Sequence, residues 1–220
     1  MKYLEERKEI IEQCLFMISS GLSRGTAGNV SVRVPEGYLM TPTGIPYDLL
    51  KPEQIVLMSM SGEYEGPVKP SSEWQFHQNV LSNRPDINAV VHTHSTYATA
   101  VAVMGREIPP LHYMVAGTGV THIPCAPYAT FGSKELANYV AEAMKVSKAC
   151  LLAHHGVITG HVNLRRAMVL ATNVEEMARL YVLCLSTGHE PPLLNEQQMV
   201  EAFQQYKTYG QQPASARLTS

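Results

Sequence analysis

Apolar and polar residues recur along this chain with two different periods. Between residues 3 and 20 the apolar side chains return every three or four positions, which predicts a helix that ends at Gly21. Residues 29–34 alternate with a period of two and predict a strand, and turns are expected at Gly37 and 41–44. The other expected elements are strands at 55–60, 87–94, 120–123 and 149–153, and helices at 71–81, 95–104, 133–145, 163–185 and from 195.

Strands and helices are interleaved along the chain, without an internal repeat or a low-complexity linker. This order favours a single three-layer α/β domain over residues 1–210. The polar residues 211–220 are expected to form a flexible tail. At the start of two helices, the pairs Ser71-Ser72 and Ser95-Thr96 are expected to cap free backbone amides.

The composition excludes several classes of protein. The chain has 220 residues, 45% of them hydrophobic and 16% charged, against about 25% charged in an average soluble protein. This hydrophobic content excludes general disorder, and the scarcity of charge suggests that some surface is buried in an oligomer. The 17 Lys and Arg against 19 Asp and Glu give a net charge of −2, which offers no broad field for nucleic acid or an anionic membrane. A small-molecule ligand is therefore expected.

The cysteines and the N-terminus indicate a reducing compartment. Cys14, Cys125, Cys150 and Cys184 form no CxxC pair, so neither a disulfide framework nor a thiolate zinc site is expected. The first residues carry acids rather than a signal sequence, and no stretch approaches the ~20 apolar residues that span a bilayer. We expect a cytoplasmic protein with no membrane partner.

Three histidines follow apolar strands in a pattern that suits a metal ion. His92 and His94 lie two positions apart at the end of an expected strand, so their imidazoles should share one face. His155 ends another apolar strand, and Gly156 would let the backbone turn sharply beside it. An HxH pair alone is often accidental. Three neutral imidazoles with an open position, however, are typical of a catalytic zinc.

Two other histidines leave alternatives open. A shift of one residue in the strand would exchange His154 with His155, so His155→Ala should abolish zinc retention and His154→Ala should not. His77 lies one turn after Glu73 and would either pack in its helix or support a ligand from behind.

Glu73 also has two interpretations. Its position is that of an ordinary acid in the first turn of a helix, where it complements the helix dipole. If the fold brings it beside the histidines, it could complete the coordination of the metal. It could then act as a general base when substrate displaces it.

Three short stretches could hold a phosphate group: 25–29, 43–44 and 71–72. Each offers hydroxyl groups or unencumbered backbone amides, and the last one opens a helix, whose N-terminus favours an anion. None is a Walker A loop or a GxGxxG motif. Each stretch taken alone would equally suit a turn or a cap.

Together these residues, in this order, resemble the class II aldolase/adducin family over nearly the whole chain to Gly210. The motifs that carry the resemblance are 25–33 (GTAGNVSVR), 41–47 (TPTGIPY), 70–74 (PSSEW), 89–94 (AVVHTH), 123–132 (IPCAPYATFG), 154–156 (HHG) and 207–210 (KTYG). The resemblance implies an α/β/α fold with a central mixed, mainly antiparallel sheet. It also implies a fourfold-symmetric homotetramer with active sites at subunit interfaces.

The resemblance further implies the roles of individual residues. One zinc ion per subunit would be held by Glu73, His92, His94 and His155, with Glu73 also transferring a proton. Tyr113 would be a catalytic residue contributed across a subunit boundary. The phosphate site would comprise Gly28, Asn29, Thr43, Gly44, Ser71 and Ser72. The aldehyde side would comprise Phe131, Tyr206 and Tyr209, although the family generally has phenylalanine where Tyr206 stands.

The activity implied is reversible cleavage of a ketose 1-phosphate, expected to be L-fuculose 1-phosphate, to dihydroxyacetone phosphate and L-lactaldehyde. One alternative is cleavage of a related 5-deoxypentulose 1-phosphate. Another is a pentulose-5-phosphate 4-epimerase of the same family, which generally carries aspartate where this chain has Glu73. A third is a binding module like the adducin head, which lacks the metal ligands that are present here.

Overall fold

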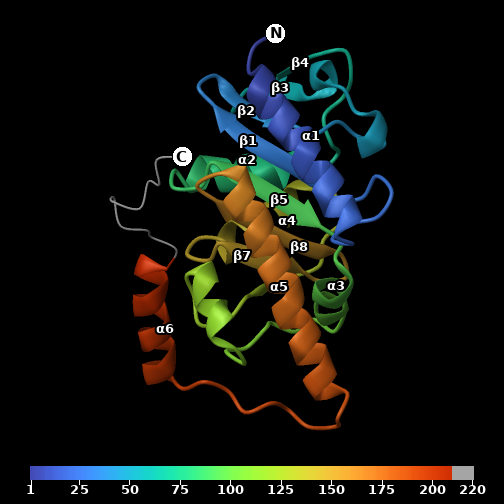
Figure 1. The fold of residues 1–220 in the computed structure, drawn as a ribbon. Helices are drawn as coiled ribbons and strands as arrows, with labels where there is room; N and C mark the ends of the chain where they lie inside the picture. Colours follow the sequence, from blue (N-terminus) through green and yellow to red (C-terminus); the bar gives the residue numbers. More distant parts are fainter. Residues whose placement is uncertain (210–220) are drawn as a thin grey trace, which may run out of the picture.

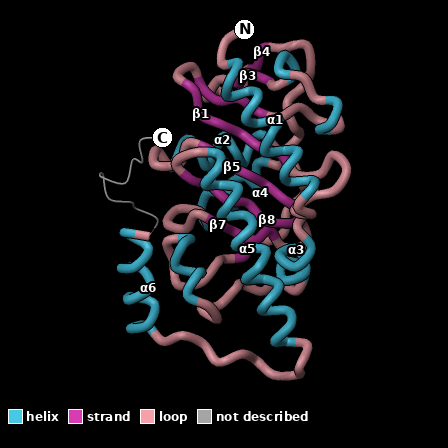
Figure 2. Tube along the Cα trace, viewed as in Figure 1, coloured by secondary structure: helices cyan, strands magenta, loops and turns pink. Residues whose placement is uncertain are grey.

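Residues 1–209, the part of the chain that this computed structural model describes, fold around an eight-stranded sheet (Figures 1 and 2). The strands run in the order β4-β3-β2-β1-β5-β8-β7-β6, and all neighbours are antiparallel except β6 and β7. The expected mixed, mainly antiparallel sheet is confirmed. The strands are β1 (Asn29–Val34), β2 (Gly37–Met40), β3 (Val56–Met58), β4 (Tyr64–Glu65), β5 (Ala89–Thr93), β6 (Cys125–Ala126), β7 (Ala149–Leu152) and β8 (Gly156–His161).

Helices cover both faces of the sheet, so the expected three layers are also confirmed. On one face α2 (Trp74–Asn83) packs against α4 (Lys134–Ala143). On the other face lie α1 (Leu4–Ser19), α3 (Thr96–Val103) and α5 (Leu164–Leu185), the long orange helix of Figure 1. The last helix, α6 (Glu196–Thr208), lies beside the 3-10 helix η3 (Tyr113–Thr118). Two further 3-10 turns are η1 (Tyr47–Leu49) and η2 (Pro52–Gln54).

Side chains satisfy a free amide at the start of α4, α5 and α6, but make no such cap bond at the start of α1, α2 or α3. Ser133, Asn163 and Asn195 each accept a hydrogen bond from the amide three residues on. Helix α3 differs, because Ser95 occupies the cap position without making such a bond. The Glu175 carboxylate of α5 accepts instead from the amides of Tyr97 (2.9 Å) and Ala98 (2.8 Å). Glu175, which is distant in the sequence, therefore fixes the start of the helix that follows the His92–His94 strand. The local sequence could not show this contact.

Several expectations about strands were wrong. The expected strand at 120–123 is a bend in which Ile123 forms an isolated bridge with Ile108, and β6 begins two residues later. Strands β2, β4 and β8 were not predicted. The turn expected at Gly37 is the first residue of β2, and β8 contains two glycines, a residue with low strand propensity. Glycine suits position 160 because the Ile87 side chain fills the space that a Cβ atom would occupy.

The described residues are consistent with one domain, and the boundary at residue 210 stays a prediction. The tail expected at 211–220 lies outside the described residues. Within residues 1–209, no helix is both long and apolar enough to cross a membrane.

Candidate metal centre

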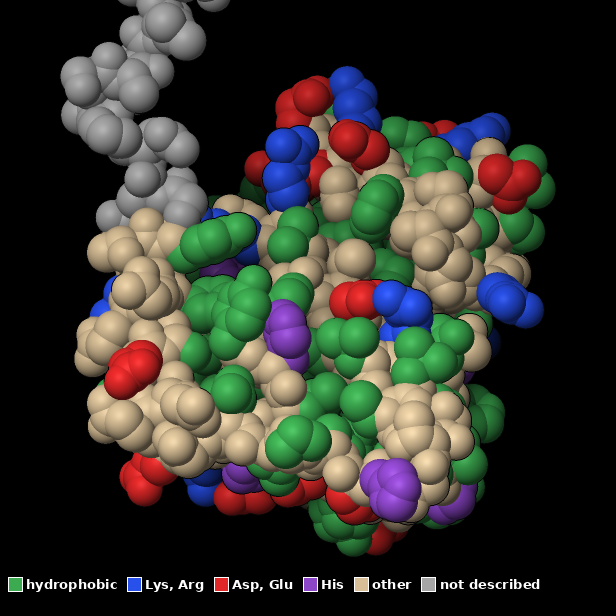
Figure 3. Space-filling view, turned by 60° about the horizontal axis from the view of Figure 1, so that its bottom comes forward, with side chains coloured by type: hydrophobic (Ala, Val, Ile, Leu, Met, Phe, Trp, Pro, Cys, Tyr) green, Lys and Arg blue, Asp and Glu red, His purple; other side chains and the backbone are tan. Residues whose placement is uncertain are grey.

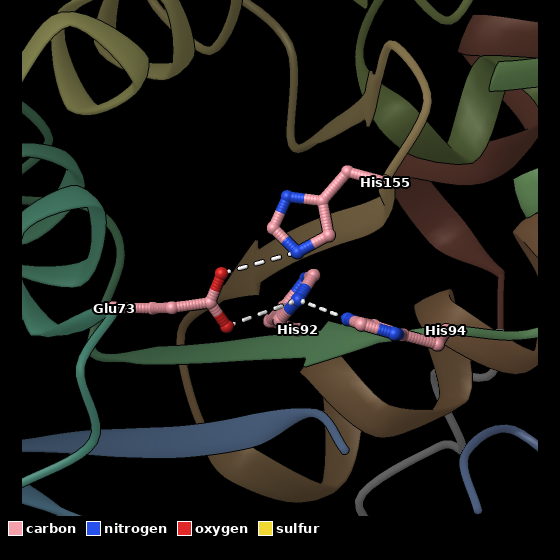
Figure 4. A group of neighbouring side chains, drawn as sticks. All are labelled: Glu73, His92, His94 and His155. Atoms are coloured by element: carbon pink, nitrogen blue, oxygen red, sulfur yellow. Dashed lines mark hydrogen bonds and ion pairs between the residues drawn. The ribbon is translucent and has the colours of Figure 1, made fainter. Parts of the chain in front are cut away.

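The end of strand β5 brings two histidines together, as the HxH spacing predicts (Figure 4). His92 is fully buried and His94 half-buried, and their Nε2 atoms lie 2.9 Å apart. The fold fixes their backbone from both sides. His92 pairs with Asn29 of β1 and Ile158 of β8, and the His94 amide donates to Ser23 Oγ at 3.1 Å.

The turn between β7 and β8 supplies the third imidazole. His155 Nε2 points at the same centre, with ring centroids 4.8 Å from His92 and 5.0 Å from His94. His154 is exposed, and its ring lies edge-on to Tyr128 at 6.1 Å. The sharp turn lies at His154, whose φ of 56° is left-handed, and not at Gly156 as the sequence suggested. The structure therefore selects His155 as the candidate ligand.

Gly156 is needed for a different reason. A Cβ atom there would lie 2.5 Å from the Thr93 carbonyl oxygen, and 3.2 and 3.3 Å from ring carbons of His94 and His92. Only glycine lets β8 approach β5 this closely behind the two candidate ligands.

Gly156→Ala is expected to lower the free energy of unfolding by about 1–3 kcal/mol, since overpacking forces the backbone to shift. It should also lower bound metal, because the shift displaces both histidine rings. Urea unfolding and metal analysis of the purified protein measure the two effects. The matched control is Gly160→Ala in the same strand, where the clash is with the Ile87 and Met144 side chains, away from the histidines. Equal metal content in Gly156→Ala and wild type would contradict this account.

Glu73 lies beside the histidines, a placement its sequence position could not reveal. It is the residue immediately before α2 and is buried. Its Oε1 is 3.1 Å from His155 Nε2, and its Oε2 is 3.4 Å from His92 Nε2. The Asn29 side-chain amide donates to Oε2 at 2.8 Å. Burial alone would raise the pKa of Glu73, but attraction to His92 and His155 and the bond from Asn29 hold it well below its usual range. The carboxylate is ionised at neutral pH.

The donor set fits a divalent metal ion. One ligand atom from each of Glu73, His92, His94 and His155 lies within 4.8 Å of the others. His92 Nδ1 lies 3.0 Å from the Val157 carbonyl oxygen, so it carries the proton and leaves the Nε2 lone pair facing the centre. This backbone partner had no sequence signal. Burial lowers the pKa of both His92 and His94, which favours the neutral, ligating form of each ring.

The three stretches considered for phosphate lie close to this centre. Tyr47 donates to the Gly28 carbonyl (2.7 Å), Thr41 Oγ1 accepts from the Val30 amide (3.1 Å), and the Ser71 amide donates to the Thr41 carbonyl (2.9 Å). These bonds tie together the loops that carry the six expected residues. Thr43, Gly44 and Ser72 are exposed and Ser71 is buried, as are Gly28 and Asn29. A role in binding phosphate stays a prediction.

The expected aromatic residues divide into two groups. Phe131 is exposed and precedes Gly132, where a Cβ would lie 2.7 Å from the Ser72 carbonyl oxygen, so its loop packs against Ser72. Tyr113 is exposed at the start of η3. Burial and the nearby Tyr113 and Tyr209 raise the pKa of Tyr206. The ring of Tyr206 lies 5.9 Å from that of Tyr209. The structure does not bring these three tyrosines into the cluster of metal-ligand candidates. Their expected contribution to a site across a subunit boundary stays a prediction.

Comparison with known proteins defines the family. Residues 8–182 match the sequence profile described as "Class II Aldolase and Adducin N-terminal domain". The chain belongs to the class II aldolase and adducin family. The resemblance drawn from the sequence motifs is thereby confirmed.

Members of this family with assigned activities are similar to the chain over nearly its full length. An L-fuculose phosphate aldolase from Haemophilus influenzae is 52% identical and covers 96% of this chain and 97% of its own. A 5-methylthioribulose-1-phosphate/5-deoxyribulose-1-phosphate aldolase from Rhodospirillum rubrum is 46% identical, with coverages of 93% and 92%. A solved L-fuculose 1-phosphate aldolase has a TM-score of 0.90 at 37% identity and covers 94% of this chain and 98% of its own. The class II aldolase fold is therefore established for this chain.

Proposed function

We propose that the protein is a zinc-dependent aldolase that reversibly cleaves L-fuculose 1-phosphate to dihydroxyacetone phosphate and L-lactaldehyde. The observation that carries the proposal is the convergence of Glu73, His92, His94 and His155 on one centre. The relatives assigned to this activity, 52% and 37% identical, support the substrate. The glutamate at position 73 disfavours the epimerase alternative, because that branch of the family generally carries aspartate there.

The residues of the site suit both halves of such a cleavage. A zinc ion held by the three imidazoles and Glu73 would supply a Lewis acid that stabilises negative charge next to the breaking carbon–carbon bond. When the bond forms, the ionised Glu73 would take the proton from the dihydroxyacetone phosphate carbon that makes the bond; when the bond breaks, Glu73 would first take up a proton from water and then give it to that carbon. Tyr113 of a neighbouring subunit would exchange the proton of the hydroxyl that becomes the aldehyde.

The phosphate would bind to the loops that precede β1, follow β2 and precede α2. Thr43, Gly44 and Ser72 are open to solvent there, beside Ser71 and the backbone of Gly28 and Asn29. Hydroxyl groups and amides near a helix N-terminus suit an anion. Phe131, Tyr206 and Tyr209 would contact the aldehyde end.

The proposal includes a cytoplasmic homotetramer. Figure 3 shows a face on which hydrophobic and uncharged side chains cover most of the area. Large apolar side chains remain exposed on this chain, among them Phe16 at 44%, Tyr128 at 62% and Phe131 at 67%. Where such side chains form a contiguous patch, they would suit contacts between subunits.

A related substrate is the second candidate. The Rhodospirillum rubrum relative, assigned to 5-methylthioribulose 1-phosphate and 5-deoxyribulose 1-phosphate, is nearly as similar as the L-fuculose phosphate aldolases. The second candidate keeps the same metal and proton-transfer residues and changes only the aldehyde.

The deciding measurement is release of dihydroxyacetone phosphate from L-fuculose 1-phosphate and from 5-deoxyribulose 1-phosphate, with and without a chelator. We expect faster release from L-fuculose 1-phosphate, loss of that release on chelation, and its return when Zn²⁺ is added. Faster cleavage of the deoxypentulose would favour the second candidate. Metal-loaded protein that cleaves neither ketose would overturn the proposal.

A further inference from the structure

A buried line of polar side chains extends from the candidate metal ligands into the protein. Glu73 Oε2 accepts from Asn29 Nδ2 at 2.8 Å, Asn29 Oδ1 lies 2.5 Å from His77 Nε2, and His77 Nδ1 lies 2.8 Å from Ser31 Oγ. His77 and Ser31 are fully buried, and Asn29 is 3% exposed. The line joins α2, which carries Glu73 at its start, to strand β1.

The hydrogen-bond roles along this line follow from its carboxylate end. The ionised Glu73 can only accept, so Asn29 must present its amide nitrogen to Glu73 and its oxygen to His77. His77 must then donate from Nε2, and its Nδ1 accepts from the Ser31 hydroxyl. Burial lowers the pKa of His77 to about 3, so the ring is neutral and carries one proton, as this assignment requires.

We propose that His77 is a positioning residue that fixes the orientation of the Asn29 amide and thereby holds the Glu73 carboxylate beside the three metal-ligand candidates. If the donor at Nε2 is lost, the amide of Asn29 can turn over and present its oxygen to the carboxylate. Glu73 would then lose its hydrogen bond and face a repulsive partner. The inference rests on the proposed metal site and is independent of the proposed substrate.

His77 also packs, since its ring stacks on Phe76 with centroids 4.9 Å apart. A test must therefore separate packing from hydrogen bonding. Two amide substitutions do so. In His77→Gln the amide nitrogen falls near the place of Nε2 and can donate to Asn29. In His77→Asn the shorter side chain reaches only the place of Nδ1, beside Ser31. Both replace the ring by an amide, so the loss of stacking is shared.

The experiment follows loss of Co²⁺ from the loaded protein to excess chelator, together with the visible absorption of the bound cobalt. Thermal unfolding of the metal-free variants checks that both fold. We expect His77→Asn to lose cobalt about 10–100-fold faster than wild type, the usual effect of removing a partner behind a metal ligand. Its cobalt absorption should also change. His77→Gln should keep the wild-type spectrum and stay within about threefold of the wild-type rate.

Equal rates in the two variants, whether slow or fast, would overturn the inference while leaving the metal site in place. A wild-type protein that binds no cobalt would overturn the proposed function and this inference together. Should His77→Asn fail to fold, His77→Gln decides by itself, because loss about tenfold faster than wild type would contradict the role of the Nε2 donor.

Discussion

Glu73→Gln is expected to lower kcat for cleavage by about 10²–10⁴-fold, the usual contribution of a positioned acid–base group. Glutamine keeps the length and shape of the side chain, and its amide oxygen can still accept the bond from Asn29. It can neither take up nor give a proton at neutral pH, whereas the wild-type carboxylate, which is ionised at rest because its pKa is held low, can take up a proton and pass it to the carbon that loses the bond. The activity should therefore collapse even where the metal is retained. Release of dihydroxyacetone phosphate per bound metal ion measures the effect.

The matched control is Glu135→Gln. Glu135 is likewise an acid at the start of a helix, but it is exposed and accepts a hydrogen bond from the Tyr139 hydroxyl. It therefore tests loss of a helix-dipole acid without loss of the proposed proton-transfer group, and wild-type kcat is expected. If Glu73→Gln kept more than about a tenth of wild-type kcat per metal ion, Glu73 would be a ligand only and the proton-transfer role would fall.

The sequence predicted the three candidate histidine ligands better than their surroundings. Strand alternation placed His92 and His94 on one face, and a second apolar strand pointed to His155. Glu73 was an open alternative on the sequence alone, and the family resemblance favoured it as a ligand, because it is distant in sequence from the histidines and resembles an ordinary first-turn acid. The bond between Asn29 and Glu73 depends on the register of β1 with β5, in which Asn29 pairs with His92. Register between distant segments is a tertiary property that a single sequence does not reveal.

For the fold, too, elements with a regular local pattern were predicted and those that depend on tertiary packing were not. Strand β1 and helix α5 were predicted within a residue because their periodicity is regular over their whole length. Strand β8 was missed, since its two glycines weaken the strand pattern and it directly follows the His154-His155 turn. Yet β8 lies between β5 and β7 in the sheet and so sets the distance between the two groups of histidines. Its glycines are explained by close packing against β5 and Ile87, which only the assembled sheet shows.

His155→Ala is expected to abolish retention of the metal. It removes one of the three imidazoles and leaves Glu73 Oε1 without its neighbour at 3.1 Å. Loss of a ligand should cost more than the about 10–100-fold in affinity that loss of an outer partner costs. Metal analysis after dialysis measures it. Thermal unfolding of the metal-free variant checks that it still folds, because the side chain that is removed is only 13% exposed.

The neighbouring histidine provides the control. His154 is exposed and points toward Tyr128, so His154→Ala should retain metal. Histidine already adopts the left-handed backbone conformation at this position, and His154→Asn is the milder substitution, because asparagine and histidine are both more common in this conformation than alanine. Metal retained by both His154 variants and lost from His155→Ala would assign the third ligand. Loss from His154→Asn at unchanged stability would instead mean that the turn presents the other imidazole, and the register of residues 153–156 would have to be revised.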